Sequence, residues 1–253
     1  VHVDSSVDPV RDKETIDIEL QLKDLETAEK RIERVKRNAK TGNKEAQAEL
    51  DVLLRIQATL LAGRSLRTLD FSEKEEEFVK PIQFITAKPV MYVCNVDESA
   101  AVNGNAYVEA VKEAVKEEAA EIIVLAVGTE ADITELDDYE ERQIFLEDIG
   151  LTEAGSAKLI RTAYKLLNLQ TYFTVGVKEV RAWTINIGDT APQAAGVIHT
   201  DFEKGFIRAE VIKYDDYISY GTESKIKEAG KLGVEGKEYV VADGDIMNFR
   251  FNV

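Results

Sequence analysis

The sequence contains few of the residues that build disulfide bonds and metal sites. Cys94 is the only cysteine, so no disulfide can form within the chain, and we expect it to be a buried strand residue. The two histidines, His2 and His199, lie far from it and from each other, without the spacing of metal ligands. We therefore expect no metal site in this segment.

Long apolar runs and an export signal are also lacking. No stretch approaches the roughly 20 apolar residues of a membrane-spanning helix, and the first residues lack the basic and apolar regions of a secretory signal. The N-terminus has no initiator methionine and reads as if cut from something longer. These features favour a cytoplasmic protein without a membrane partner.

Positive charge is scarce. The chain of 253 residues has 32 Lys and Arg against 48 Asp and Glu, a net charge of −16. This balance excludes a general nucleic-acid coat protein and favours a soluble monomer, so any RNA contact would be local. The charge is uneven, because residues 19–76 are neutral whereas residues 77–168 carry −10. This partition suggests three structural units, and 44% hydrophobic residues supply the material for their cores.

Residues 19–76 are predicted to form an antiparallel helical hairpin. Apolar residues recur at steps of three and four from Leu25 to Ala39, and the pattern resumes from Ala46 through Gln57 to Leu60. Gly42 and Asn43 would supply the turn. Seven basic residues lie near this tip: Lys30, Arg31, Arg34, Lys36, Arg37, Lys40 and Lys44. A solvated helix face and a contact with RNA phosphates are both open.

Residues 77–168 alternate strands and helices. The runs PVMYVCN and EIIVLAV are typical of strands buried on both faces, and helical spacing extends over 107–120 between them. Strand, helix and strand in this order imply a right-handed parallel crossover, so the fold class is α/β. A further helix is expected over 151–169.

Residues 169–253 hold short strands and one helix with a capping box at Thr190 and Gln193, which predicts a small mixed sheet packed on one helix.

The first buried strand ends abruptly at Asn95. Ligands of open α/β sheets bind beyond the carboxyl ends of the strands. An amide offers one acceptor and two donors, which suits the edge of a purine. Glu98, three residues on, can turn back to the same edge. The sequence therefore predicts a nucleotide-base site here.

The tetrapeptide NVDE stands where P-loop GTPases have the base-reading motif Asn-Lys-x-Asp, with Val96 for Lys and Glu98 for Asp. This variant resembles the YchF group of Obg-like ATPases, in which the altered motif goes with binding ATP as well as GTP. The resemblance extends along the chain. HVDSSVDPVRD resembles the family segment after the switch regions, DLETAEKRIERVKRNAKTGNKEA its helical arm, and APQAAGVIHTDFEKGFIRAEVI with DGDIMNFRFNV its TGS domain.

The resemblance implies a fold of three parts. Residues 1–18 and 77–168 would belong to the parallel sheet of a P-loop NTPase (G domain), 19–76 to the helical arm, and 169–253 to a TGS domain with a β-grasp, ubiquitin-like fold. It also implies ATP, or GTP, as the ligand with Mg²⁺. The phosphate loop G-x-x-x-x-G-K-[ST] occurs nowhere in the chain. We therefore expect upstream residues to hold Mg²⁺, and this segment alone to be inactive.

The resemblance assigns roles to individual residues. The residues expected to read or contact the base are Asn95, Val96, Glu98, Ala126, Val127 and Gly128. The last three lie in the loop AVGTE, which would offer backbone N–H groups although it departs from the usual Ser-Ala form. His2 is a candidate to orient the attacking water, and a strand-end histidine with a satisfied ring is the alternative.

Two functions stay open at this stage. The first is an ATPase coupled to ribosomes or their subunits, with RNA contacts through the arm and the TGS domain. The second is a ribosome- or RNA-binding adaptor in which the nucleotide acts only as a switch. A stable fragment without catalysis is a third reading of the segment itself.

Overall fold

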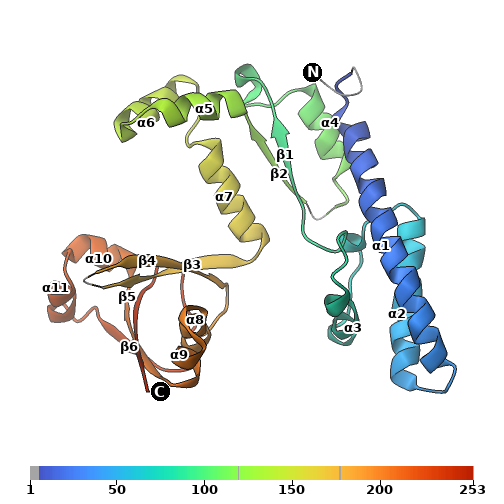
Figure 1. Cartoon of the computed structure of the whole chain (residues 1–253). Coiled ribbons are helices and arrows are strands. Elements are labelled where there is room, and N and C mark those ends of the chain that lie inside the picture. Colours follow the sequence, from blue (N-terminus) through green and yellow to red (C-terminus); the bar gives the residue numbers. More distant parts are fainter. Residues whose placement is uncertain (1–5, 119, 177, 253) are drawn as a thin grey trace. The chain divides into compact units, whose positions relative to one another are not determined.

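A computed structural model describes residues 6–118, 120–176 and 178–252 of the chain. The chain divides into two compact units, residues 1–160 and 161–253, which are described separately. Both combine helices with a sheet (Figure 1), so the α/β class predicted from the sequence is confirmed. Among the described residues, no helix has both the length and the hydropathy that crossing a bilayer requires.

The helical hairpin of the first unit is formed by α1 (Pro9–Ala39) and α2 (Lys44–Leu61), which lie side by side (Figure 1). The first helix begins ten residues before the range 19–76, because Asp8 caps it through the N–H of Arg11 and Pro9 occupies its first turn. Gly42, with a φ of 84°, makes the turn between the helices. Asn43 then caps α2.

The core of the hairpin follows the predicted seam with one correction. Ala28, Ile32 and Val35 of α1 are buried, as is Leu53 of α2. Gln57 was expected in the seam, but Ile56 fills the core there and is fully buried. The amide of Gln57 instead donates to Glu29 at the exposed border, 3.4 Å away, because a polar group can keep its hydrogen bonds there.

The sheet of the first unit has two parallel strands, β1 (Met91–Asn95) and β2 (Glu121–Leu125), connected through α4 (Ala106–Ala114). Helix α4 ends well before residue 120, because the following residues turn to place Glu118 against α1. Strand β1 is not buried on both faces. The side chain of Val93 is 46% exposed, since β2 is the one strand that pairs with β1 among the described residues.

Short helices complete the first unit. They are η1 (Leu66–Thr68), α3 (Glu73–Val79), η2 (Lys80–Ile82), η3 (Glu98–Ala100), α5 (Val127–Glu135) and α6 (Tyr139–Asp148). Helix α7 (Gly155–Leu166) crosses the division between the units. It is shorter than the helix expected over 151–169, because Asn168 adopts a φ of 56° and strand β3 begins at residue 169.

The second unit contains a five-stranded mixed sheet with the order β4-β3-β7-β5-β6. The strands are β3 (Leu169–Val175), β4 (Val180–Asn186), β5 (Phe206–Ile212), β6 (Gly233–Glu235) and β7 (Ile246–Phe251). Helix α8 (Ala191–Ile198) starts with the predicted capping box of Thr190 and Gln193. It packs on the sheet through buried alanines, and the hydroxyl of Tyr172 donates to the carbonyl of Ala194. Helices α9 (Thr200–Lys204), α10 (Tyr214–Tyr220) and α11 (Glu223–Glu228) complete this unit.

Candidate functional site

The carboxyl ends of β1 and β2 place two predicted site segments next to each other. The strands pair in parallel register, with Asn95 opposite Leu125, so the residues that follow them emerge at the same edge. The N–H of Val96 donates to the carbonyl of Leu125. The side-chain Oδ1 of Asn95 accepts a hydrogen bond of 3.1 Å from the backbone N–H of Val127. One contact therefore joins the two segments.

This hydrogen bond orients the exposed amide of Asn95. Because Oδ1 accepts from the N–H of Val127, the two donors of Nδ2 remain available to another partner. Oδ1 keeps a second lone pair that can accept one more hydrogen bond. The amide can therefore donate to a ring nitrogen of a purine and accept from an exocyclic amine at the same time.

The segment 126–130 is not the loop that was expected. Ala126 is the N-cap residue of α5, and Val127 begins the helix, because the N–H of Glu130 reaches the carbonyl of Ala126 and closes the first turn. The exposed backbone at Gly128 still presents an N–H group, since the first turn of a helix has no intrahelical partner for it. The N–H of Val127 is already taken by Asn95.

Glu98 lies just beyond the strand end. It opens the short helix η3, its side chain is exposed, and no described residue binds its carboxylate. Val96 is half-buried. The structure thus brings Asn95, Val96 and Val127 together and leaves the carboxylate of Glu98 unengaged nearby along the chain.

A groove of about 530 Å³ runs beside β1. Its walls come from α1, β1 and α4, and they are mostly apolar, with Ile16, Val93 and Val111 among them. Asn95 stands at this groove as well. The exposed face of β1 therefore borders an apolar surface that leads to the strand end.

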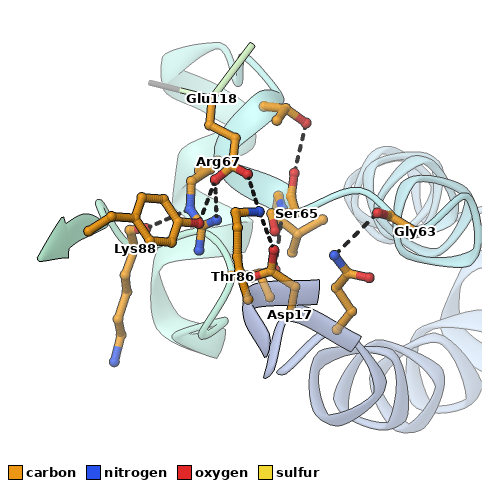
Figure 2. Close-up of polar contacts among 12 residues, drawn as sticks. Asp17, Gly63, Ser65, Arg67, Thr86, Lys88 and Glu118 are labelled. Atoms are coloured by element: carbon orange, nitrogen blue, oxygen red, sulfur yellow. Dashed lines mark hydrogen bonds and ion pairs between the residues drawn. The ribbon is translucent and has the colours of Figure 1, made fainter. Parts of the chain in front are cut away.

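A cluster of charged groups ties the base of the helical hairpin to the α/β part (Figure 2). Glu118 accepts from Lys13 at 2.6 Å, from Arg67 at 3.2 Å and from the hydroxyl of Tyr92 at 2.9 Å. Lys13 also pairs with Asp17 at 2.6 Å. We call these five residues the root cluster. Their charges are shielded, since 8% to 18% of each charged side chain is exposed.

The root cluster stabilises the ionised forms of Lys13 and Glu118 and the neutral form of Tyr92. Burial raises the pKa of Tyr92 to about 12, and the hydrogen bond to Glu118 adds to the shift. Burial alone would raise the pKa of Glu118, but the hydrogen bonds from Lys13 and Tyr92 lower it overall. Burial alone would lower the pKa of Lys13, and its bonds to Asp17 and Glu118 raise it instead. The cluster is therefore an ion-pair network at neutral pH.

A second carboxylate, that of Asp24, ties α1 to the segment that precedes β1. Asp24 of α1 is 2% exposed and accepts three hydrogen bonds. They come from the N–H of Ile85 at 2.9 Å and from the N–H and hydroxyl of Thr86, both at 2.7 Å. The hydroxyl of Thr86 in turn accepts from the N–H of Leu66. All donors around this carboxylate are satisfied, so the base of the hairpin is rigidly held.

The basic residues at the hairpin tip divide into two groups. Lys30 pairs with Glu26, Arg31 with Glu49 and Lys36 with Glu33. Four others are exposed and have no ion-pair partner among the described residues: Arg34, Arg37, Lys40 and Lys44. We call these four the free tip. Their positive charge is available to an external anion.

Of the two histidines, the structure describes His199. His2 lies outside the described residues, so its expected role stays a prediction. His199 is exposed, and its Nδ1 accepts from the N–H of Asp201 at 3.1 Å, which caps the short helix α9. Its ring therefore serves the local fold.

Sequence reasoning did not identify Asp24, Glu118 and Glu130 as site residues. Each binds groups that are far away in sequence, 61 residues from Asp24 to Ile85 and 25 residues from Glu130 to Gly155. An isolated carboxylate on a helix looks the same in sequence whether it faces water or a distant backbone. No local signal could have found them.

Comparisons with known proteins agree with one another. A family model, YchF-GTPase_C, described as a protein of unknown function (DUF933), matches residues 169–252. The ribosome-binding ATPase YchF of Escherichia coli O157:H7 is 52% identical over 253 residues, which is 100% of this chain and 69% of that protein. The ribosome-binding ATPase YchF of Bacillus subtilis is 47% identical over 254 residues, with the same coverage.

A solved structure gives the same result. The structure of the Schizosaccharomyces pombe YchF GTPase matches with a TM-score of 0.84 and 36% identity, over 99% of this chain and 68% of that one. The chain therefore spans about two thirds of the length of the proteins that it matches.

Proposed function

The chain belongs to the YchF family, and on that premise we propose that it is the base-selecting and ribosome-contacting part of a nucleoside triphosphate hydrolase that uses ATP and accepts GTP. The observation that carries this proposal is the hydrogen bond between Asn95 and the N–H of Val127, which joins two base-reading segments at one strand end. The complete protein would act in the cytoplasm as a monomer on ribosomes or their subunits.

Asn95 would bind the purine edge that carries N7 and the group at C6. Adenine and guanine share N7 and differ at C6. Its Nδ2 would donate to N7, and the second lone pair of its Oδ1 would accept from the 6-amino group of adenine. Glu98 replaces an Asp that in GTPases accepts from the N1 proton and 2-amino group of guanine. Adenine lacks both groups, so the longer carboxylate is free to sit elsewhere. The N–H of Gly128 would contact the base, beside Ala126, Val127 and Val96, since the N–H of Val127 holds Asn95.

Hydrolysis would need residues that precede this segment. We propose that the third of the relatives' length that this chain does not span contributes the phosphate loop and the ligands of Mg²⁺, and that it packs along the apolar groove beside β1. The 46% exposure of Val93 in a strand supports this packing. Mg²⁺ would neutralise phosphate charge when bound. His2 would orient the attacking water.

The division into parts proposed for the chain follows from the same resemblance. Residues 1–18 and 77–168 would belong to the G domain, with the parallel pair β1 and β2 as part of its sheet. Residues 19–76 would form the arm. The mixed sheet packed on α8 supports a β-grasp TGS domain over 169–253, which offers a further RNA-facing surface.

Nucleotide binding tests the base-reading role. The protein used is the chain joined to the N-terminal third found in its relatives, and the dissociation constants of ATP and GTP are measured by calorimetry with Mg²⁺. We expect Asn95→Ala to weaken both nucleotides about tenfold, through the loss of one or two hydrogen bonds. Glu98→Asp is expected to shift the preference toward GTP. Unchanged affinities in Asn95→Ala would contradict the proposal, as would submillimolar ATP binding by the 253-residue chain alone.

The free tip supports a ribosome contact. Four exposed cations without ion-pair partners can each neutralise a phosphate of ribosomal RNA and release counterions. We expect replacement of Arg34, Arg37, Lys40 and Lys44 by Gln to lower the slope of log affinity against log salt by about three. The paired residues Lys30, Arg31 and Lys36, replaced in the same way, are the matched control and are expected to change the slope much less. Equal slopes for both variants would contradict a phosphate contact at the free tip.

The adaptor reading makes a different prediction. If the nucleotide is only a switch, the extended protein would bind ATP and ribosomes without turning ATP over. Multiple-turnover hydrolysis, measured with and without ribosomes, separates this alternative from the ATPase. His2→Ala is expected to reduce turnover with little change in ATP affinity, and unchanged turnover would remove His2 from the site.

A further inference from the structure

The carboxylate of Glu130 joins two helices directly beside the proposed base site. Glu130 lies one turn into α5, the helix that begins at Val127. Its Oε1 accepts from the N–H of Gly155 at 2.6 Å, and its Oε2 accepts from the N–H of Ser156 at 3.0 Å. Both donors belong to the first turn of α7. Glu130 therefore supplies, from another helix, the acceptors that the start of α7 needs.

The contact depends on a residue without a side chain. A Cβ at Gly155 would lie 2.9 Å from Oε1 of Glu130 and 3.0 Å from the Cβ of Leu125. Real Cβ atoms essentially never lie under 3.0 Å from another atom, so a side chain at Gly155 would displace the carboxylate of Glu130. The approach to Leu125 would in addition require a shift of a few tenths of an ångström. Because Leu125 is the last residue of β2 and is buried, the helix cannot shift toward the strand. The contact between Glu130 and the start of α7 is therefore best made with glycine at this position.

The side chains of Asn95 and Glu130 bind the starts of two successive helices. Asn95 binds the first N–H of α5 at Val127, and Glu130, three residues further, binds the first turn of α7. Residues three apart on a helix lie on the same side, so the start of α5 is held at both points. A shift of α5 would move the N–H of Val127 and release the amide of Asn95.

We propose that Glu130 is a positioning residue for base recognition. By fixing the first turn of α5 against α7, it keeps the N–H of Val127 where it aligns the amide of Asn95 toward the base. Glu130 does not itself touch the nucleotide. The proposal rests on the proposed function, because it needs Asn95 to read a purine.

The test compares a ligand that has a base with one that lacks it. Dissociation constants of ATP and of inorganic triphosphate, both with Mg²⁺, are measured for the chain joined to the N-terminal third of its relatives. We expect Glu130→Gln to weaken ATP about tenfold, since one carboxylate acceptor is replaced by an amide donor, and to change triphosphate affinity less than about twofold. Gly155→Ala is expected to act like Glu130→Gln.

The matched control is Glu135→Gln, the same change on the same helix at an exposed residue that no described residue binds. It is expected to leave both ligands unchanged. Unaltered ATP affinity in both Glu130→Gln and Gly155→Ala would overturn the proposal, and so would an equal loss for ATP and triphosphate. If the unaltered protein binds ATP no better than triphosphate, the base contributes nothing to binding and the proposed function fails. If the unaltered protein prefers ATP and the Glu130 and Gly155 variants keep that preference, only the role of Glu130 fails.

Discussion

The two ends of the helical arm treat charge in opposite ways. At its base, Lys13 and Arg67 both pair with Glu118, and at most 14% of each side chain is exposed. At its tip, Arg34, Arg37 and two lysines are exposed and have no ion-pair partner among the described residues. Charges that are buried and paired determine geometry, whereas charges that are exposed and unpaired can be shared with a partner. The arm is thus held by paired charges at one end and presents unpaired charges at the other.

The largest effect is expected from Asp24→Asn, which tests the fixed end. The new amide would direct a donor at a buried N–H or hydroxyl that now donates to Asp24, so we expect a loss of about 3 kcal/mol in the free energy of unfolding. Urea unfolding followed by circular dichroism at 222 nm monitors the helices. Trp183 is the only tryptophan and lies in the second unit, so its fluorescence is an internal reference.

The matched control for Asp24 is Asp51→Asn, the same change at an exposed position of α2. It is expected to alter stability by less than about 0.5 kcal/mol. A loss in Asp24→Asn that is no larger than in this control would show that the buried carboxylate does not hold the arm. A parallel shift of the Trp183 signal would place the effect outside the arm.

A smaller effect, about 2 kcal/mol, is expected from Glu118→Gln, because two cations lose their shared carboxylate. The effect depends on pH. The pKa of Glu118 is lowered below its ordinary value of 4.5, so its contribution is present above that value and is lost as the pH falls through the lowered pKa. The difference between the unaltered protein and the variant is therefore expected to shrink below about pH 4.5.

The neighbouring Glu117→Gln provides the control for Glu118, since Glu117 is exposed and no described residue binds it. Unfolding by urea is measured between about pH 3 and pH 7 for all three proteins. A stability difference for Glu118→Gln that stays constant over this range would contradict an ionised Glu118 as the centre of the root cluster.

The smallest effect is expected from the free tip. Replacement of its four basic residues by Gln is expected to change the free energy of unfolding by less than about 1 kcal/mol in total, because exposed charges without partners contribute little to stability. The same dichroism measurement checks this. A loss as large as that of Glu118→Gln would mean that the tip charges serve the fold and are not reserved for a partner.

The parts of the fold that sequence reasoning predicted are those with local signals. The spacing of Ala28, Ile32 and Val35 indicated the hairpin, because a helical seam repeats every three or four residues. The strand ending at Asn95 and the capping box at Thr190 also have local signals, an apolar run and the spacing of Thr190 and Gln193. The buried positions of the hairpin follow from the pattern of neighbouring residues.

The errors arose where distant contacts decide the structure. The segment after Leu125 was read as a loop from its place in a motif, although helix-forming residues after Gly128 make it the start of α5. Val93 was expected to be buried from its neighbours alone, and the exposure of a strand depends on what packs against it. The pairing of Glu130 with Gly155 also has no local signal.

The candidate base site was predicted from a local sequence pattern together with a family resemblance. The strand end at Asn95 came from local pattern, and its link to Val127 came from resemblance to a family motif. The structure brings the two residues within one hydrogen bond. Their role in binding a nucleotide stays a prediction, as does the role of His2.

Because α1 is long, a small change of angle at its base would displace its tip by a large distance. The helix is continuous from Pro9 to Ala39, and from Lys13 to its last residue it rises about 39 Å at 1.5 Å per residue. A tilt of about 10° at the base would therefore move the tip sideways by about 7 Å, roughly one turn of a helix and more. Because Lys13 and Asp24 both hold α1 near this end, their contacts determine how precisely the tip of the arm is placed.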